Sequence, residues 1–557
     1  MEDAQNSKLS LFITLVICVA IIHFPFLNKA FRIDDTLFYY TAKQILANPL
    51  KPYSFHINWL GDTQRAYDFF SNPPGISYYI AFIIFIFGTN EKVIHLFYIL
   101  FSLLSVFSMY FLTKRFTKFP LASTLLLVFS PIYMIMAHTI MPDLPLVALF
   151  LLSVTLFVYG SDQQNILFLV LSGIAASIVI LIRYNGLAII PILSFYYLLH
   201  FNAKKKWNIL VLLIPTVVFV AWNLFTKSVY GESHFFFHLA FQRYLEKMSL
   251  KGTMKHLLPH LSYLGGGTIF PLFFLIPVLS KNKTDKILFV ILGIYIFSAA
   301  FHFGKGFNYD YVHTLLSCIF IFCIVYFLLI FLKKVAAILF LKKRILTDEV
   351  FLLVWIFGML AMQNSGIQSA AKYMIVIIPP LIILLMKDSY WTKHRGIYCN
   401  IMICAMLFFT VVMGFITAAA DYESANVNRK IADYCEKNIK IGKNNNIWFL
   451  GHWGFQYYME KKGFRAYEQY SNEPQKGDFL VRSSLAWPQR MSRRLKVRFV
   501  DRVRYSGTIP IRIMHNEPGK HANFYAFLNY DIGYGILPFS ISSSHIDEFT
   551  IYQIIDK

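Results

Sequence analysis

The chain has 557 residues and a mean hydropathy of +0.53; 57% of its residues are hydrophobic and only 15% are charged. Soluble proteins average about 45–50% apolar and about 25% charged residues, so this composition excludes an ordinary soluble globular protein. The formal net charge is +22. The basic residues gather in short clusters between apolar runs, a pattern typical of the cytoplasmic loops of membrane proteins rather than of nucleic-acid binding.

Apolar runs long enough to cross a bilayer, about 20 residues each, recur between residues 9 and 420. We predict about thirteen membrane spans with the N-terminus in the cytoplasm, because the basic clusters then all fall on one side. A tight turn at Arg183 and Tyr184 leaves open a second reading, in which these residues lie inside one broken helix. The predicted spans are 9–27, 93–112, 120–137, 144–160, 165–182, 185–200, 208–224, 266–280, 286–303, 311–332, 349–364, 371–387 and 396–419.

The polar segment 28–92 lies between two strong spans and is predicted to be an ordered outer loop; such loops tend to carry function. Its apolar stretch Ile76–Phe87 is short for a span and better suits an interfacial or re-entrant helix. After residue 420 no run could cross a bilayer, and an amphipathic helix pattern at about 424–439 precedes short β-rich patches. We therefore divide the chain into a transmembrane domain, 1–420, and a small extracytoplasmic α/β domain, 421–557.

Carboxylates stand at the outer ends of two spans. Asp34 and Asp35 follow the first span, and Asp143 begins a later span between two prolines. Carboxylates beside a lipid surface are costly to desolvate, so they require a cation, a metal or a substrate hydroxyl as partner. Helix capping by Asp35 or Asp143 is the alternative explanation.

Other polar islands interrupt the apolar pattern on the same predicted side. Asn72, Pro73 and Pro74 form an extended entry to the short apolar helix, although a simple turn would have the same sequence. Arg183-Tyr184 and Lys372-Tyr373 lie between strong apolar runs. Such cations are often anchors that reach the membrane surface, but they also suit a phosphate held outside the membrane.

The order of these elements resembles the GT-C superfamily of polytopic glycosyltransferases. The features in common are one span, an outer loop with an Asp-Asp pair and a later Pro-Pro-Gly, and two spans that enclose an outer Pro-Asp. More narrowly, the chain looks like the branch of protein O-mannosyltransferases and aminoarabinose transferases, which use polyprenyl-phosphate-linked sugars. The resemblance is best over residues 9–200.

The resemblance implies roles for individual residues. One member of the acidic pair would be the catalytic carboxylate, a second outer acid would assist it, and late basic-aromatic pairs would bind the donor phosphate. Asn72 departs from the family, in which His or Lys often precedes the proline pair. The implied catalytic residues are Asp34, Asp35 and Asp143, the implied donor phosphate-binding residues are Arg183, Lys372 and Tyr373, and the implied substrate loop is Asn72, Pro73 and Pro74.

The implied activity is that of a hexosyl- or pentosyltransferase. It would move a sugar from a polyprenyl phosphate to a lipid, glycan or protein acceptor at the extracytoplasmic face of a bacterial inner membrane, with membrane lipids and no nucleic acid as further partners. Family members differ in metal use, so a divalent cation, Mg or Mn, stays open, with Asp34 and Asp143 as its ligands. The alternative is a polytopic transporter or lipid flippase of envelope precursors, although such proteins typically place charges at mid-bilayer.

Overall fold

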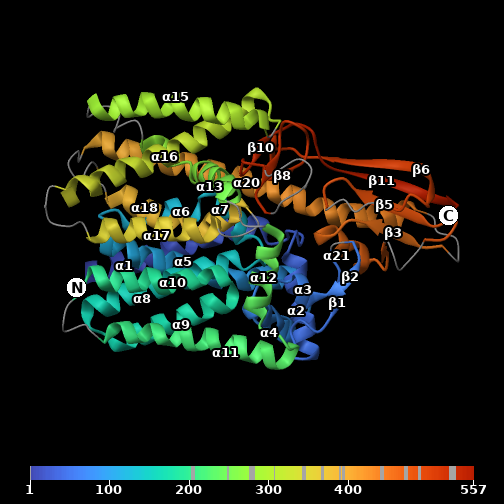
Figure 1. Ribbon diagram of the computed structural model, residues 1–557, viewed down its shortest axis with the longest axis horizontal. Coiled ribbons are helices and arrows are strands. Elements are labelled where there is room, and N and C mark those ends of the chain that lie inside the picture. The colour runs from blue at the N-terminus through green and yellow to red at the C-terminus, as the bar shows by residue number, and fades with distance from the viewer. Residues whose placement is uncertain are drawn as a thin grey trace.

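The computed structural model shows a bundle of roughly parallel and antiparallel helices that continues into a C-terminal domain containing a β-sheet (Figure 1). The N-terminus lies at the far end of the bundle and the C-terminus at the opposite end of the long axis (Figure 1). The structure describes residues 2–59, 61–201, 207–246, 250–274, 283–306, 308–340, 347–364, 369–387, 391, 396–439, 445–468, 474–486, 491–525 and 535–556.

Within the described residues, six helices are long and apolar enough to cross a membrane, and a bent pair of shorter helices makes a seventh candidate. Further apolar helices of 10–17 residues coincide with other predicted spans. The predicted polytopic helical membrane protein is thus confirmed, whereas the exact number of spans is not. The long candidates lie within α1 (Glu2–His23), α5 (Glu91–Phe116), α8 (Asp143–Gln163), η4 and α11 (Asn208–Leu212 and Leu213–Tyr230), α16 (Tyr311–Phe340) and α20 (Ile397–Asn438).

The described residues form further helices, some in the bundle and some in the segments that connect it. They are η1 (Phe24–Phe26), α2 (Asp35–Ala47), α3 (Ala66–Phe69), α4 (Gly75–Phe87), α6 (Pro120–Val128), α7 (Pro131–Ala137), α9 (Ile166–Ile182), η2 (Tyr184–Ala188), α10 (Ile189–Leu199), α12 (His234–Glu246), α13 (Leu250–Thr268), α15 (Lys283–Gly306), α17 (Thr347–Asn364), η5 (Ala371–Val376), α18 (Ile378–Lys387) and α21 (Trp453–Lys461).

Two breaks in the helical pattern have local causes. Helices α6 and α7 meet at a bend of 63°, where Ser130 is extended because the following Pro131 disfavours a helical conformation before it. Helix α9 ends at Ile182, and the backbone of the next residue, Arg183, is also extended. The Tyr196 hydroxyl on α10 then donates to Asp162 at the end of α8, at 3.3 Å. The end of α8 is joined to the start of α9 by a short turn, so this bond places the end of α10 near the start of α9. The chain therefore reverses at Arg183, and the interpretation as one broken helix is wrong.

Ion pairs tie several helix ends together at the end of the bundle remote from the C-terminal domain. Arg115 at the end of α5 contacts Asp162 at 2.7 Å and Asp348 at 3.6 Å. Lys387 at the end of α18 contacts Asp348 at 2.5 Å, and His200 after α10 lies 3.2 Å from the same carboxylate. These helix termini therefore lie together at one end of the bundle, and the predicted cytoplasmic location of that end stays a prediction. The basic stretches 204–206, 342–344 and 392–395 of the same predicted side lie outside the described residues.

The segment 28–92 is an ordered loop, as predicted. It contains α2, a hairpin of β1 (His56–Asn58) and β2 (Thr63–Arg65), α3 and α4. Helix α4 coincides with the predicted short apolar helix. It begins at Gly75, where a Cβ atom would lie 2.5 Å from the carbonyl oxygen of Leu181. Only glycine allows this close approach of α4 to the end of α9.

The C-terminal domain contains a mixed five-stranded sheet with strand order β4-β3-β5-β11-β6. Strand β3 pairs in parallel with β4 and β5, and β11 pairs in antiparallel fashion with β5 and β6. Two short two-stranded pairs, β10-β7 and β8-β9, lie beside it. The bounds are β3 Ile447–Leu450, β4 Arg465–Ala466, β5 Phe479–Ser483, β6 Lys496–Ser506, β7 Ile511–Arg512, β8 Met514–His515, β9 Ala522–Asn523, β10 Ser540–Ile541 and β11 His545–Asp556.

The bundle and the C-terminal domain share packing. Helix α20 runs without a break for 42 residues from the bundle into the sheet region, through the predicted boundary at residue 420, and includes the amphipathic stretch predicted at about 424–439. One cluster of buried apolar side chains extends from Leu15 on α1 to Ile551 on β11. The division into two domains stays a prediction, but this continuous core packs the C-terminal sheet against the helices.

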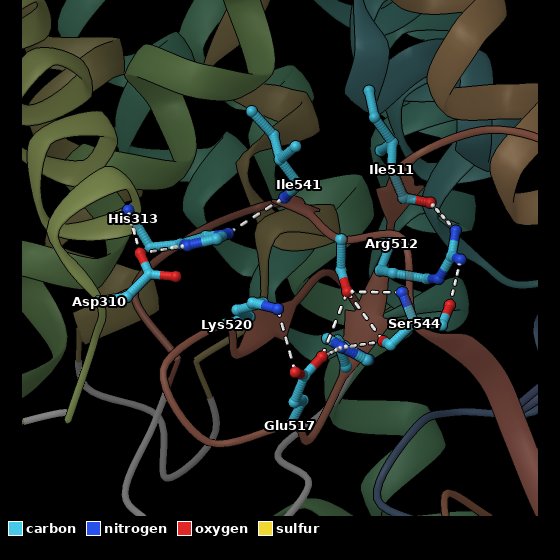
Figure 2. A network of polar contacts seen from close by, with 10 residues as sticks. Asp310, His313, Ile511, Arg512, Glu517, Lys520, Ile541 and Ser544 are labelled. Carbon is cyan, nitrogen blue, oxygen red and sulfur yellow. Dashed lines mark hydrogen bonds and ion pairs between the residues drawn. The ribbon is translucent and has the colours of Figure 1, made fainter.

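A polar network also docks the C-terminal domain on the start of α16 (Figure 2). The Ile541 amide donates to His313 Nε2 at 3.1 Å, so Nδ1 carries the proton and donates to Asp310 at 2.7 Å. Deeper in the domain, Glu517 accepts from Lys520 at 3.0 Å, and the Arg512 guanidinium donates to backbone carbonyls (Figure 2). These bonds hold the described residues 510–525 and 535–545 beside the start of α16.

Candidate active site

The structure joins Asp34 of the first outer loop to Lys372 of η5. After η1 the chain turns at Ile33, whose φ of +49° is rarely adopted by a β-branched residue. This turn places Asp34 just before α2, where its carboxylate lies 2.9 Å from the Lys372 ammonium. The Lys372 side chain is 3% exposed and the Asp34 side chain 33% exposed. Asp34 is therefore the member of the acidic pair that a substrate in solution can reach.

Asp35 is fully buried and has different partners. One carboxylate oxygen accepts from the Arg32 amide and the other from the Ile140 amide, both at 2.9 Å. Burial raises the pKa of Asp35 to about 7, against the opposing effects of Lys29 and of the two backbone amides. Asp35 thus connects the first outer loop to the segment that precedes Asp143. Its bonds do not go to the first turn of α2, so the capping explanation for Asp35 is wrong.

A second ion pair lies at the same end of the bundle. Asp143, the first residue of α8, contacts the Arg183 guanidinium at 2.5 Å. The guanidinium also lies 4.4 Å from the ring centre of Tyr373, the neighbour of Lys372. Asp143 is buried, and its second oxygen, Oδ2, has no hydrogen-bond partner among the described residues. Asp143 therefore holds Arg183 and retains one oxygen for a further ligand.

The two ion pairs form one charged cluster. Met141, two residues before Asp143, places its sulfur 3.7 Å from the Lys372 ammonium, and Arg183 and Lys372 both lie against the Tyr373 ring. Two carboxylates balance two cations, and three of the four side chains are largely buried. Because charges interact strongly where little water is present, an incoming anion would compete with Asp34 and Asp143 for the two cations.

Three further charged residues, Lys29, Arg32 and Asp421, form a buried cluster beside the segment that carries Asp34. The sequence analysis did not select them. Asp421 on α20 accepts from Arg32 at 2.6 Å and also pairs with Lys29. The Tyr525 hydroxyl donates to the same carboxylate at 2.6 Å. The only sequence signals were two cations just outside the first span and an acid that directly follows the last apolar run. Neither signal indicates that residues almost 400 positions apart meet.

The proline loop lies beside Arg183 rather than in the ion pairs. The Asn72 carbonyl accepts from the Tyr53 hydroxyl at 2.7 Å, and Pro74 precedes α4, whose first residue packs on the end of α9. Among the described residues, the bonds of Asn72, Pro73 and Pro74 are with this surrounding loop. The loop therefore supports the backbone near Arg183, and its predicted contact with substrate stays a prediction.

Tyr184, next to Arg183, is turned toward the helices that cover the outer loop. Its hydroxyl accepts from Trp222 at 2.9 Å and contacts His234 Nδ1 at 2.7 Å. His234 Nε2 in turn donates to the Phe70 carbonyl at 2.9 Å. Tyr184 therefore links α11 and α12 to η2, and His234 continues the link to the loop 28–92. Of the predicted pair Arg183-Tyr184, Arg183 is the residue that belongs to the charged cluster.

The side chains of the site provide few ligands for a resident metal ion. Within the part of the chain that the structure describes, no group of three or more His, Cys, Asp or Glu side chains is arranged to hold one. The two candidate ligands, Asp34 and Asp143, each face a cationic side chain instead. A divalent cation at this site would first have to displace Lys372 or Arg183.

Comparison with known proteins gives a family match and a shared fold. Residues 71–225 match the family model described as dolichyl-phosphate-mannose-protein mannosyltransferase. This stretch includes the proline loop, Asp143 and Arg183. No curated protein matches the chain by sequence.

Among solved structures, ArnT from Cupriavidus metallidurans bound to undecaprenyl phosphate superposes with a TM-score of 0.50 at 12% identity, over 86% of this chain and 93% of that chain. The oligosaccharyltransferase AglB from Archaeoglobus fulgidus gives a TM-score of 0.46 at 12% identity, over 83% of this chain and 64% of that chain. The arabinofuranosyltransferase AftD from Mycobacteria gives 0.44 at 9% identity, over 98% and 40%. The predicted resemblance to GT-C glycosyltransferases is confirmed by the family match and by the ArnT-like fold, and the chain is an integral membrane protein.

Proposed function

We propose that this chain is a membrane glycosyltransferase that moves a sugar from a polyprenyl-phosphate donor to a lipid, glycan or protein acceptor at the extracytoplasmic face. The observation that carries the proposal is the pairing of Asp34, the accessible carboxylate, with the buried Lys372 beside the Asp143–Arg183 pair. This cluster offers a base and two cations within one site. The ArnT-like fold and the mannosyltransferase family match support the donor class.

Asp34 is the general base in this mechanism. It accepts the proton of the acceptor hydroxyl while the acceptor oxygen bonds to the anomeric carbon of the sugar. The bond between that carbon and the phosphate oxygen breaks, and its electron pair leaves with the polyprenyl phosphate. Asp34 suits this role because its side chain is one-third exposed, whereas Asp35 is fully buried and bonded to backbone amides.

Lys372 and Arg183 bind the donor phosphate. In the structure each cation is paired with a carboxylate. A bound phosphate would take over Lys372 and release Asp34 to contact the acceptor hydroxyl. The two cations also neutralise the charge that builds on the departing phosphate. Asp143 orients Arg183 and offers its unpartnered Oδ2 to the acceptor.

A transfer assay tests this function. The purified protein in detergent would be given radiolabelled undecaprenyl-phosphate-linked pentoses and hexoses together with envelope glycolipids, and labelled acceptor would be separated from donor. Transfer that is lost in Asp34→Asn and retained in Asp68→Asn would support the proposal. Movement of the intact donor across a proteoliposome membrane without cleavage of the glycosyl bond would instead favour the flippase alternative.

The orientation we propose places the N-terminus in the cytoplasm and the sheet outside, in a bacterial inner membrane. The support is the separation of the basic helix ends around Arg115 and Lys387 from the candidate active site. Single cysteines at exposed Arg498 and exposed Lys114 test it with a thiol reagent that does not cross membranes. Labelling in intact cells is expected at Arg498→Cys only, and labelling at Lys114→Cys only would reverse the orientation.

A further inference from the structure

A short stretch of the C-terminal domain, Asn523–Tyr525, extends into the candidate active site, and all three of its residues are buried. The Asn523 side-chain amide donates to the Ser369 carbonyl at 2.8 Å. The Lys372 backbone amide donates to the Phe524 carbonyl at 3.0 Å. These two bonds enclose residues 369–372, so the C-terminal domain holds the backbone that carries Lys372.

The bond to Lys372 has a clear local cause. Lys372 lies in the first turn of η5, where backbone amides have no partner within the helix. The Phe524 carbonyl satisfies one such amide in a buried place, where an unpaired amide would be costly. The position of the Lys372 ammonium beside Asp34 therefore depends on a contact from outside the bundle.

Tyr525 contacts the chain segment that carries Asp34, the other partner of the ion pair. Its hydroxyl donates to Asp421, which also accepts from Arg32, two residues before Asp34. The Tyr525 ring lies 5.3 Å from the Arg32 guanidinium and 5.9 Å from the Lys372 ammonium. The stretch 523–525 thus contacts the chain segments that carry both Asp34 and Lys372.

We infer that Asn523 and Tyr525 are positioning residues that set the geometry of the Asp34–Lys372 pair. The C-terminal domain is then part of the catalytic unit. This inference rests on the proposed function, because it assigns Lys372 to the donor phosphate. Lysine has a long flexible side chain, so a small shift of its backbone moves the ammonium, and misplacement by about 1 Å can cost about 100-fold in rate.

The first test compares two asparagine variants in the full-length protein. Asn523→Ala removes the bond to Ser369 and a bond of 3.1 Å to the Tyr263 hydroxyl, whereas Asn516→Ala removes a bond of 2.9 Å to the Ser484 carbonyl inside the C-terminal domain. We expect Asn523→Ala to lower kcat and to weaken binding of undecaprenyl phosphate, each about tenfold, and Asn516→Ala to change neither. Equal effects of the two variants would overturn the inference.

The second test asks whether Asn523 acts through Lys372. In a double-mutant cycle, Asn523→Ala should have little further effect on undecaprenyl phosphate binding once Lys372→Ala is present, whereas additive losses would overturn the inference. If Asn523→Ala does not fold, Tyr525→Phe replaces it, because it removes one hydroxyl only. If Lys372→Ala itself binds and transfers like the wild type, the phosphate role in the proposed function fails. If Lys372→Ala is impaired and both positioning variants are normal, only this inference fails.

Discussion

The Asp34→Asn substitution should change catalysis and donor binding in opposite directions. The asparagine amide cannot take up the proton of the acceptor hydroxyl, and loss of a general base typically lowers kcat by about 10²–10⁴-fold. The same change removes the negative charge that occupies Lys372 at 2.9 Å. The phosphate then no longer competes with Asp34, so the affinity of the protein for a polyprenyl phosphate should rise.

The size of the binding effect follows from the exposure of the pair. Lys372 is buried, but Asp34 is one-third exposed, so solvent screens part of their attraction. We take the upper end of the range for exposed ion pairs, about 1 kcal/mol, which corresponds to about fivefold tighter binding. Fluorescence or calorimetric titration with undecaprenyl phosphate measures this change, and single-turnover transfer measures the chemical step.

Asp68→Asn is the matched control. Asp68 lies in the same outer loop, has the same 33% exposed side chain and also forms an ion pair, with Arg65 at 2.9 Å. Both kcat and the donor Kd should stay at wild-type values in this variant. The reasoning is refuted if Asp34→Asn keeps kcat within threefold of wild type, or if it binds undecaprenyl phosphate more weakly than Asp68→Asn does.

Three further substitutions test neighbouring parts of the site. Arg183→Lys loses the planar guanidinium that stacks on Tyr373 at 4.4 Å, so donor binding should weaken about tenfold in a titration with undecaprenyl phosphate; unchanged binding would remove Arg183 from the phosphate site. Asp421→Asn leaves Lys29 and Arg32 buried without their carboxylate and should cost about 3–5 kcal/mol of folding stability, seen as a large fall in Tm. Because the pKa of Asp35 is raised from 3.8 to about 7, the folded protein keeps a proton that the unfolded chain releases, and stability should fall as pH rises between these values, by at most about 1.4 kcal/mol per pH unit. Thermal melts from pH 4 to 8 should show that slope in the wild type and its absence in Asp35→Asn, and equal slopes would contradict the assignment.

The sequence predicted the helical membrane architecture because bilayer thickness imposes a length on apolar runs that survives without tertiary information. The breaks were harder to predict. The predicted span 120–137 ran straight through the bend between α6 and α7, although Pro131 stands there, whereas the turn predicted at Arg183 and Tyr184 lies where α9 ends and η2 begins. The continuity of α20 through residue 420 was also not readable, since polarity changes there while helical geometry does not.

The sequence predicted which residues belong to the site, but it did not predict which of them form ion pairs. Carboxylates and cations at span ends were visible, yet the pairing of Asp34 with Lys372 joins residues 338 positions apart. The sequence also could not show which of Asp34 and Asp35 is accessible, because adjacent residues have the same sequence context. Only the turn at Ile33 separates them: it exposes Asp34 and buries Asp35 against the Ile140 amide.

The charge balance of the site implies an order of events. With Asp34 on Lys372 and Asp143 on Arg183, each carboxylate of the two pairs faces a cation, so in the free protein the general base is engaged with Lys372. A donor phosphate relieves this pairing only by occupying the cations itself. Asp34 therefore becomes an effective base when the activated sugar is already in place, which would limit proton transfer before the donor binds. An acceptor that bound first would meet a carboxylate still engaged with Lys372, and steady-state kinetics should accordingly show donor binding ahead of productive acceptor binding.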